Sequence, residues 1–338
     1  MTHISSKLLR NSRTAGVAEK TVIALERHTQ RIRTAVESGE AARSMLVASW
    51  SRCIHSHGLD PTREQPRHVL TEAELKSATE PIESLLFSAE TTLERLRTST
   101  EGGGVCILFA GADGIPVRWY GQQADMDDLW DWGLCPGVDW SEKAGGTNGI
   151  GTCLVEKSPL SVHREQHFYE RDIDISCAVA PIFNHSGLLA GALDITLYGT
   201  AATGIFSSFA LAAVSEAARQ IEISHFHYVF NTARILSVAD RQCSGAGLLA
   251  VDADDVVVGA TRSARLKFEL TDEHLRDGVS AMDILGDRND DLENAERGAI
   301  RRALARSSGN VTAAARALNV SRSTMKRKLR QYGVKRKA

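Results

Sequence analysis

The 338-residue chain lacks the segments that would place it in or across a membrane. No apolar run approaches the roughly 20 residues of a membrane span, and the first residues hold no apolar core of a signal peptide. The six cysteines are scattered, and none shows the C-x-x-C spacing of zinc or redox sites. We therefore expect a soluble, cytoplasmic protein with no membrane partner and with reduced, packed thiols.

Signatures of phosphate binding and catalysis are also missing. No G-x-x-x-x-G-K-[ST] string occurs, and no lysine follows the glycine-rich stretch at 145–151, so that stretch cannot form a P-loop. His163 and His167 have a spacing that suits a metal site on a helix, but Glu165 is misplaced for the H-E-x-x-H zinc motif. We favour surface or hydrogen-bonded histidines and a packed thiol at Cys177, and we predict no catalytic residue, no metal and no cofactor.

The charge is distributed unevenly along the chain. Residues 291–338 hold 13 Lys and Arg against 3 Asp and Glu, whereas the rest of the chain holds 27 against 39. A basic end on an acidic body is typical of a nucleic-acid-binding module. A solvated basic tail would give the same count, so charge alone leaves both interpretations open.

Residue periodicity predicts an α+β protein. Helices are expected within 5–57 and 71–100, the second opened by a capping box of Thr71 and Glu74, with Pro81 in the first turn of a further helix. An antiparallel sheet with two hairpins should follow, and then one long helix over 205–236. Residues 247–262 read as another hairpin and a helix, too short to build a full sheet. The expected strands are 105–109, 115–120, 151–155, 160–162, 177–183 and 188–197.

The end of the chain predicts a helix-turn-helix. A first helix over about 292–307 turns Ile300 and Leu304 inward, and a short second helix covers 312–318. Asn310 and Ser321 suit the N-caps of the second and third helices, and Asn319 suits a left-handed turn between them. In the third helix Met325 and Leu329 share the inner face. The opposite face is basic and hydroxyl-rich, as major-groove binding requires, and consists of Ser323, Lys326, Arg327 and Arg330.

This segment resembles the Fis-type helix-turn-helix. The matching strings are Gly-Asn-x-Thr-x-Ala-Ala at 309–315 and Arg-x-Thr-x-x-x-Lys-Leu-x-x-Tyr-Gly at 322–333. The resemblance implies a dimeric domain whose matching positions lie at or near double-stranded DNA. With the outward residues added, the predicted DNA-binding set is Asn310, Thr312, Ser321, Arg322, Ser323, Thr324, Lys326, Arg327 and Lys328.

Three earlier strings resemble the sensor region of the acetoin-catabolism (AcoR-like) regulators, which carry a GAF domain. They are Ser-Trp-Ser-Arg-Cys at 49–53 with Gly-Leu-Asp-Pro at 58–61, Gly-Thr-Asn-Gly-Ile-Gly-Thr at 146–152, and Ala-Pro-Ile-Phe at 180–183 with Gly-Ala-Leu-Asp at 191–194. Residues 246–285 resemble a remnant of a PAS domain. Those relatives carry a sigma-54-interacting ATPase before the helix-turn-helix, and its activity is not carried over. The candidate effector-binding residues in this region are Trp119, Trp140, Thr147, Asn148, Thr152 and His167.

The tryptophans admit a second interpretation, because clustered aromatic residues are as typical of a packed core as of a pocket.

We set the domains at 1–69 for the helical region, 70–236 for the GAF-like sensor, 244–285 for the PAS-like segment and 289–338 for the DNA-binding domain.

The leading hypothesis is a ligand-responsive transcription regulator that binds an inverted-repeat operator and a small-molecule effector, with RNA polymerase as a candidate partner. A homodimer is expected to pair through Ile300 and Leu304, or through a stripe of Phe209, Ala213 and Ile221 on the long helix. The alternatives are a ligand-independent DNA-binding factor, and a small-molecule-binding protein or enzyme with a basic docking tail.

Overall fold

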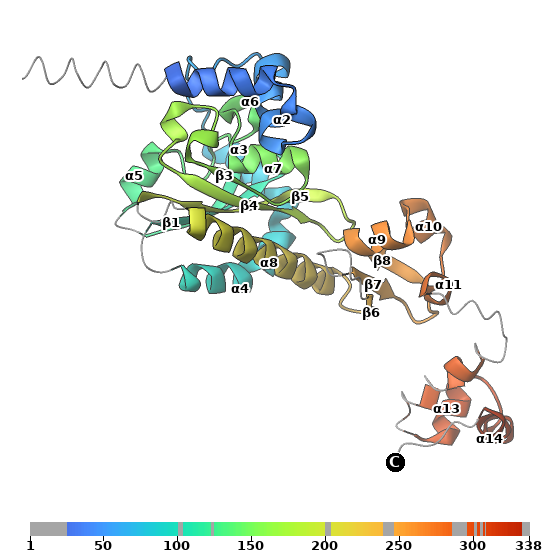
Figure 1. The fold of residues 1–338 in the computed structure, drawn as a ribbon. Helices are drawn as coiled ribbons and strands as arrows, with labels where there is room; N and C mark the ends of the chain where they lie inside the picture. The colour runs from blue at the N-terminus through green and yellow to red at the C-terminus, as the bar shows by residue number, and fades with distance from the viewer. Residues whose placement is uncertain are drawn as a thin grey trace, which may run out of the picture. The chain divides into compact units, whose positions relative to one another are not determined.

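The computed structural model divides into two compact units, residues 1–278 and 279–338, and each is described by itself (Figure 1). The residues that the structure describes are 26–100, 104–122, 125–199, 204–238, 247–285, 296–300, 303–304, 307 and 309–332. The expected linker at 286–290 lies outside them. No helix in this described part of the chain is long and apolar enough to cross a membrane.

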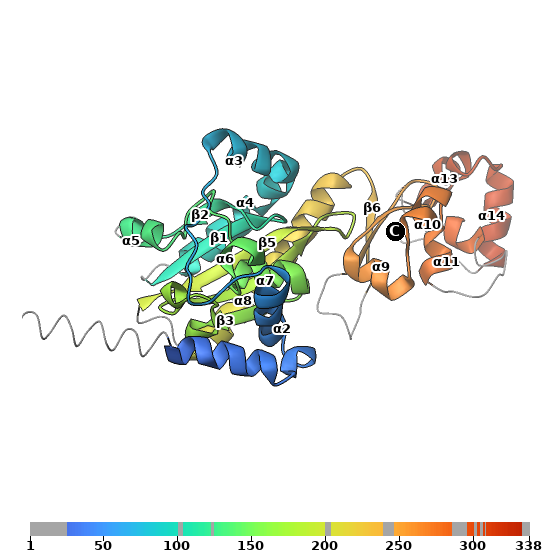
Figure 2. The ribbon, with the colours of Figure 1, turned by 90° about the horizontal axis from the view of Figure 1, so that it is seen from above.

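The first unit begins with short helices, of which α2 (Met45–Ser51) continues into a π-helical turn, Arg52–Ser56. Gly58 follows with φ of 66°, a left-handed conformation that suits glycine and ends the helix as predicted. Residues 26–37 form a helix beside α2 and bury Ile32 against Trp50 and Cys53. Figures 1 and 2 show α2 lying against α7 (Gly149–Glu156) of the sensor.

Two further helices lead into the sheet. α3 (Glu72–Thr79) carries the predicted capping box, with Thr71 and Glu74 each bonded to the other's backbone. Pro81 stands in the first turn of a 3-10 segment, Glu80–Ile82, that runs into α4 (Glu83–Ser99). These predictions are confirmed.

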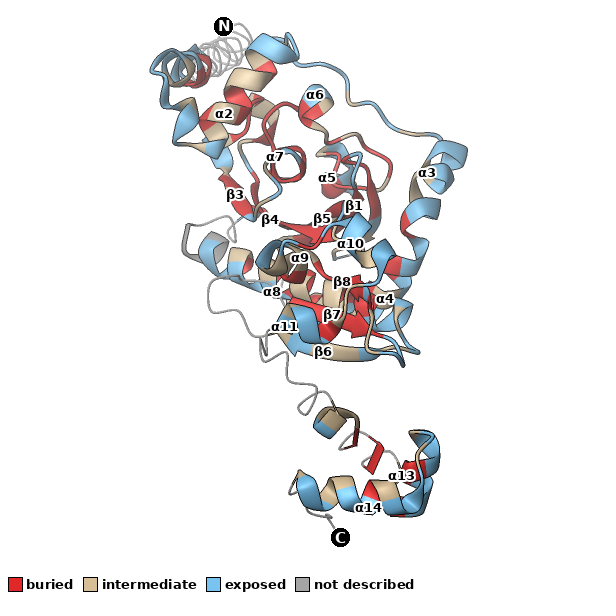
Figure 3. Ribbon diagram, turned by 90° about the vertical axis from the view of Figure 1, so that its right-hand side faces the viewer, coloured by how far each residue is buried: buried red, intermediate tan, exposed pale blue. Residues whose placement is uncertain are grey.

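A five-stranded antiparallel sheet forms the centre of the first unit. Its order is β2-β1-β5-β4-β3, so the last of its five strands along the chain, β5, lies in the middle of the sheet. Both predicted hairpins are present, at Gly114 and at 184–187. α4 and α8 (Gly204–Val229) cover one face, while α7 covers the other (Figure 3). The strands are β1 Val105–Gly111, β2 Pro116–Tyr120, β3 Leu160–His163, β4 Ser176–Phe183 and β5 Leu189–Leu197.

Two predictions of secondary structure are wrong. The expected strand at 151–155 belongs to helix α7, whose first turn is capped by Asn148. The run is short and apolar throughout, so hydrophobic periodicity cannot distinguish a strand from a helix there. The long helix ends at Val229 and not near 236, since β6 (Arg234–Val238) turns away to pair with β7 (Gly247–Val251). Two short helices that the periodicity missed are α5 (Met126–Asp131) and α6 (Glu142–Gly145).

Residues 247–262, expected to be too short for a full sheet, pair with β6 to form a three-stranded sheet. The order is β6-β7-β8, with β8 at Val257–Ala260, followed by the predicted helix α9 (Arg262–Phe268) and by α10 (Asp272–Asp277). The hairpin of β7 and β8 is confirmed, and the segment forms part of a three-stranded sheet because β6, which precedes it in the chain, supplies the third strand.

Side chains join the two sheets of the first unit. The backbone N–H of Phe183 donates to the Glu222 carboxylate over 2.8 Å, and His185 Nδ1 lies 3.3 Å from His225 Nε2 on α8. The Arg262 guanidinium stacks 4.3 Å from the centroid of the Phe183 ring. The β4–β5 hairpin, the end of α8 and the start of α9 therefore share one partly buried junction.

The second unit contains α11 (Ala281–Leu285), α13 (Val311–Ala317) and α14 (Arg322–Gln331), with residues 296–300 and 303–304 also helical. Asn319 has φ of 50°, the predicted left-handed turn. Met325 is fully buried, and Ile300 and Leu304 pack beside it in the same core. Their burial removes the pairing surface that the sequence placed on Ile300 and Leu304, and that expectation is wrong.

Removing Arg52 should destabilise the first unit. Arg52→Ala leaves the carboxylate of Glu142, whose side chain is 2 % exposed, buried without its ion-pair partner. We expect the free energy of unfolding to fall by roughly 3 to 5 kcal/mol in urea titrations. Arg97→Ala is the matched control, because its pair with Glu94 is exposed and should cost under about 1 kcal/mol. Equal effects of the two variants would contradict a structural role for the buried pair.

Candidate functional site

The turn of the second unit is fixed by two side-chain caps. The Asn310 side chain accepts hydrogen bonds from the backbone N–H groups of Thr312 and Ala313, over 3.0 and 3.1 Å. The Ser321 hydroxyl accepts from Thr324 N over 3.0 Å. These bonds satisfy amide groups that a helix start leaves without partners. Both caps were predicted, and each orients the start of a helix that carries candidate DNA contacts.

The outer face of α14 is basic and exposed. Met325 lies in the core, so the residues on the opposite side of the helix point to solvent. Thr324 is half-buried, with its hydroxyl 2.8 Å from that of Ser321. The exposed members of the predicted set are Asn310, Thr312, Ser321, Arg322, Ser323, Lys326 and Arg327, and Arg330 joins them.

Lys328 has a different position from the other predicted contacts. Its ammonium pairs with Glu296 of the preceding helix, and the Tyr332 hydroxyl donates to the same carboxylate. The hydrogen bond from Lys328 lowers the pKa of Glu296. Lys328 therefore ties the third helix to the first, a contact that its spacing in the sequence did not reveal.

The glycine-rich string at 146–152 builds the start of α7. Asn148 caps the helix by accepting from Gly151 N over 2.8 Å, while its amide donates to the carbonyl groups of Trp140 and Gly146. A Cβ at Gly151 would lie 2.6 Å from the Trp140 carbonyl oxygen. The string thus serves close packing of α7 against the segment before it, and Asn148 is fully committed to that task.

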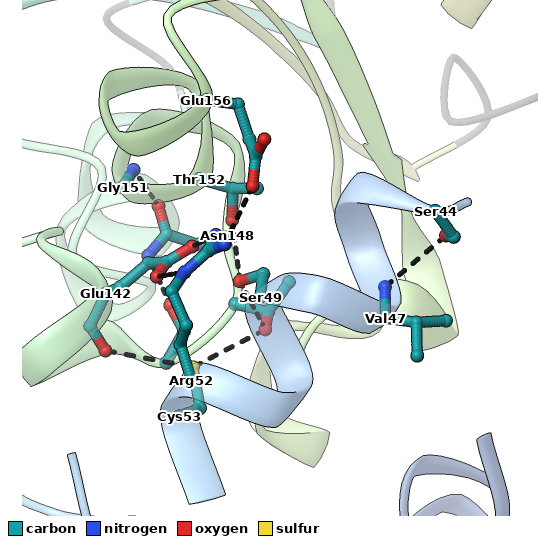
Figure 4. A network of polar contacts seen from close by, with 12 residues as sticks. Ser44, Val47, Ser49, Arg52, Cys53, Glu142, Asn148, Gly151, Thr152 and Glu156 are labelled. Atoms are coloured by element: carbon teal, nitrogen blue, oxygen red, sulfur yellow. Dashed lines mark hydrogen bonds and ion pairs between the residues drawn. The ribbon is translucent and has the colours of Figure 1, made fainter. Parts of the chain in front are cut away.

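The N-terminal helix α2 binds the same string (Figure 4). The Ser49 hydroxyl donates to Thr147 over 2.8 Å and lies 3.1 Å from the Thr152 hydroxyl. Arg52 makes two hydrogen bonds of 2.8 Å to the Glu142 carboxylate, which raise the pKa of its guanidinium. Thr147 and Thr152, predicted to contact an effector, are thus brought together by contact with the chain's own first helices.

The two histidines of the 163–167 segment are hydrogen-bonded. His167 is fully buried, with Nδ1 2.9 Å from the Arg164 carbonyl oxygen and Nε2 3.6 Å from Cys177 Sγ. Burial lowers the pKa of His167 and raises that of the Cys177 thiol, so both side chains are neutral. His163 lies 2.7 Å from the Ser176 hydroxyl. Within the described residues, no group of three or more His, Cys, Asp or Glu could hold a metal ion.

The clustered tryptophans are separated by the fold. Trp140 is buried and donates to the Gly133 carbonyl, with the Arg67 guanidinium 4.5 Å from its ring centroid. Trp132 packs edge-on against Tyr198, and Trp130 is exposed. Trp119 of β2 packs against the core on the α7 side, and its buried indole N–H faces the Cys106 thiol, whose pKa it lowers.

Asp194 is a polar residue of the sensor interior that the sequence reasoning did not single out. It lies on the central strand β5 and is 1 % exposed. Its Oδ2 accepts from the Thr196 hydroxyl over 2.6 Å, and its Oδ1 has no partner. Burial raises the pKa of this carboxyl to about 7. The sequence did contain a signal for this residue, because Asp194 is the one acidic residue in the largely apolar strand β5. It is the last residue of the Gly-Ala-Leu-Asp string at 191–194, which was used only for its family resemblance.

Comparison with known proteins agrees with both halves of this geometry. The GAF domain model matches residues 85–225, and the model of the bacterial regulatory protein, Fis family, matches residues 291–332. The chain is 32% identical over 230 residues to the acetoin catabolism regulatory protein of Cupriavidus necator, covering 67% of this chain and 34% of that protein. The chain carries a GAF domain and a Fis-type helix-turn-helix and is homologous to the acetoin catabolism regulators.

A second homologue is the acetoin dehydrogenase operon transcriptional activator AcoR of Bacillus subtilis, 28% identical over 180 residues, or 52% of this chain and 30% of that protein. The chain spans about a third of the length of these curated relatives. Among solved structures, the complex of DhaR(N) and DhaL from E. coli aligns with a TM-score of 0.49 at 14% identity, over 77% of this chain and 85% of that one. The predicted resemblance to AcoR-like regulators is confirmed.

The buried carboxyl of Asp194 should make stability depend on pH. The folded-state pKa of about 7 lies above the ordinary value of 3.8, so folding takes up a proton between these values and stability declines as pH rises from about 4 to about 7. Asp194→Asn should remove that decline. Relative to wild type, we expect the variant to gain on the order of 4 kcal/mol at pH 8 and little at pH 4.

Urea titrations at the two pH values measure this difference between the proteins. Burial also raises the pKa of Glu222 to about 7, and its contribution is present in both proteins and cancels. A difference between variant and wild type that is the same at both pH values would contradict the raised pKa.

Proposed function

We propose that this chain regulates transcription by binding an operator through α14 and by responding to a small molecule bound in its GAF domain. The observation that carries the proposal is the exposed basic face of α14, presented on a helix-turn-helix whose two caps and core are in place. Arg and Lys on such a face bond phosphates and guanine edges, and short hydroxyl side chains add donors at close range.

The sensor half supports ligand binding by a buried polar group. A carboxyl oxygen of Asp194 lies inside the domain without a hydrogen-bond partner, although buried polar groups are normally hydrogen-bonded. The sheet that carries Asp194 is joined through Glu222 and Arg262 to α8 and α9, which lead toward the DNA-binding half in the chain. A bound effector can thus alter the elements that precede the operator-binding domain.

ATP has no part in this proposal. The glycine-rich string caps and packs α7, and its amide at Gly151 already donates to Asn148. A P-loop would instead need free amides and a lysine to hold phosphates. RNA polymerase is the partner expected if operator binding activates transcription, as the names of the homologous activators suggest.

Removing one arginine from the outer face should weaken operator binding. We expect Arg327→Ala and Arg322→Ala each to lower specific affinity by about 1 to 3 kcal/mol and to reduce the salt dependence of binding by about one ion. The measurement is fluorescence anisotropy with full-length protein, on duplexes first selected from a random library by the wild type.

Arg95→Ala is the matched control, since it removes the same charge from an exposed position on α4. Near-wild-type affinity in both α14 variants would overturn the recognition-helix assignment. Operator binding that no effector changes would favour a ligand-independent factor that competes for the sites of longer relatives. Absence of DNA binding would favour a small-molecule-binding protein or enzyme with a basic docking tail.

We also propose a homodimer, because one short recognition helix buries too little surface for useful specificity and two can read half-sites about one helical turn apart. The stripe predicted on α8 is wrong in part: Phe209 and Ala213 are exposed, but Ile221 lies in the core. The outer surface of α4 and α8 offers a different pair, Phe87 and Tyr228, whose rings lie 5.5 Å apart and are 71 % and 48 % exposed.

Sedimentation equilibrium should find a dimer at micromolar concentration and a monomer for the double variant Phe87→Asp and Tyr228→Asp. A charge on each exposed ring position would have to be desolvated in the paired state, which opposes association. Trp130→Asp is the matched control, because this exposed aromatic residue lies on α5. A wild type that stays monomeric both free and on DNA would refute the dimer.

A further inference from the structure

The first described helices form a cap with an apolar cluster of its own. The cap comprises residues 26–56, which include the helix over 26–37, α2 and the π-helical turn that follows α2. Its cluster is separate from the two clusters on the faces of the five-stranded sheet. A segment that packs through a small separate cluster can open while the main core stays folded. The buried members are Ile32, Val47, Trp50 and Cys53 of the cap and Phe168 and Tyr169 of the sensor.

The seam between the cap and the sensor buries polar atoms without satisfying them. Among the described residues, His28 Nδ1, Thr29 Oγ1 and the Tyr169 hydroxyl are buried and have no hydrogen-bond partner. His28 and Thr29 lie on the same face of the first helix as Ile32, and that face packs against the sensor. Each of these atoms loses hydrogen bonds to water when the cap closes and gains none in return. The closed cap is therefore less stable than its apolar contacts alone would make it.

The charged contacts across the seam are ones that water can replace. Arg52 and Glu142 form the most buried ion pair of the cap (Figure 4). Opening returns both ions to water, and their hydration offsets much of the attraction that is lost. The pair of Arg31 and Glu165 lies at the surface, where an ion pair contributes little to stability. These pairs fix the position of the closed cap without making its opening prohibitive.

The seam is also incompletely packed at one side. An open cavity of about 520 Å³ lies there, between Arg31 of the cap and the sensor segments 163–166 and 173–174. Arg164 in its wall has φ of 45°, a left-handed conformation that is costly for a residue other than glycine. The chain leaves the cap at Gly58, where a Cβ atom would meet no other atom within 4 Å. The exit from the cap is thus free to rotate without a clash.

We propose that the cap is a regulatory element that opens and closes as one unit about Gly58 while the five-stranded sheet stays folded. Opening breaks the contacts of Ser49 with Thr147, just before α7, and with Thr152 in that helix. A movement of α7 and an opening of the cap must therefore alter one another's equilibrium. The proposal goes beyond the proposed function and stands or falls independently of operator binding.

The experiment follows the buried thiols of the full chain during labelling with N-ethylmaleimide at pH 8. Cys53 is buried in the cap cluster, whereas Cys106, Cys153 and Cys177 are buried in the core under α7 and serve as internal references. Burial raises the pKa of all four thiols, so each reacts slowly until it is exposed. With mass spectrometry of the labelled peptides, we expect Cys53 to react at least tenfold faster than the three references.

Two variants should close the cap more firmly by removing a hydroxyl that has no partner. Tyr169→Phe and Thr29→Val keep the shape of the side chain, and we expect each to slow the labelling of Cys53 at least fivefold. Thr29 lies on a different helix from Cys53, so agreement between the two variants excludes a local effect of Tyr169 on the thiol. Ser49→Ala removes the contacts with Thr147 and Thr152 and should speed the labelling at least threefold.

Tyr120→Phe is the matched control, because it removes a tyrosine hydroxyl from β2, outside the cap. It should leave the labelling rate of Cys53 unchanged, and the reference cysteines should keep their rates in every variant. Hydrogen exchange of the wild type adds a readout that involves no thiol. The backbone amides of α2 should exchange at least tenfold faster than those of β5, and Tyr169→Phe should slow α2 alone.

The proposal is overturned if Cys53 reacts no faster than the references, or if Tyr169→Phe and Thr29→Val leave its rate unchanged or raise it. It is equally overturned if a variant changes the rates of all four thiols alike, because the whole domain would then be opening. Should either closing variant fail to fold, the other variant and the hydrogen exchange of α2 and β5 in the wild type decide the question.

Discussion

The buried ion pair between Arg52 and Glu142 is the interaction on which the sensor half depends. It joins the turn that follows α2 to α6, beside the string at 146–152 where Ser49 meets Thr147 and Thr152. Because Glu142 is almost wholly buried, its charge is tolerable only while the guanidinium is present. The pair thus adds a charged contact with the first helices to the apolar packing that holds α7 over the sheet and encloses Asp194.

The DNA-binding half is organised on a different principle. Its core is small, and its geometry comes from caps at Asn310 and Ser321 and from the left-handed turn at Asn319. The pair of Lys328 and Glu296 holds the first and third helices together, while the other Lys and Arg side chains described in this unit are exposed. Basic side chains of α14 that face the first helix therefore stabilise the domain, whereas those on the opposite face of the helix are available to bind DNA.

Local signals were readable in the sequence where they act over a few residues. The caps at Asn310 and Ser321, the box at Thr71 and the two hairpins depend on near neighbours, and the residue types alone indicated them. The helix at 149–156 was mistaken for a strand because its run is short and apolar on every side. The recruitment of β6 and the contact of α2 with α7 depend on residues far apart in the chain, which no periodicity records.

The candidate effector residues also divide into those that the sequence indicates and those that only the fold reveals. The polar string at 146–152 stood out by composition, yet its hydroxyl and amide groups satisfy one another and Ser49. Asp194 was inconspicuous in the sequence and acquires meaning only from the register that places it beside Cys106 and opposite Leu108. Such a residue is identified by the bond it does not make, which requires all of its neighbours to be known.

The junction at Phe183 determines where this protein can be divided for study. Phe226 on α8 and Phe230 just after it pack against the three-stranded sheet β6-β7-β8. The ring of Phe230 occupies the space that a side chain at Gly259 would need. A fragment ending with α8 would expose the ring of Phe226 together with the face of Phe183 that Arg262 covers, and such a patch promotes aggregation. A sensor fragment that keeps these contacts extends through Gly278, the end of the first compact unit.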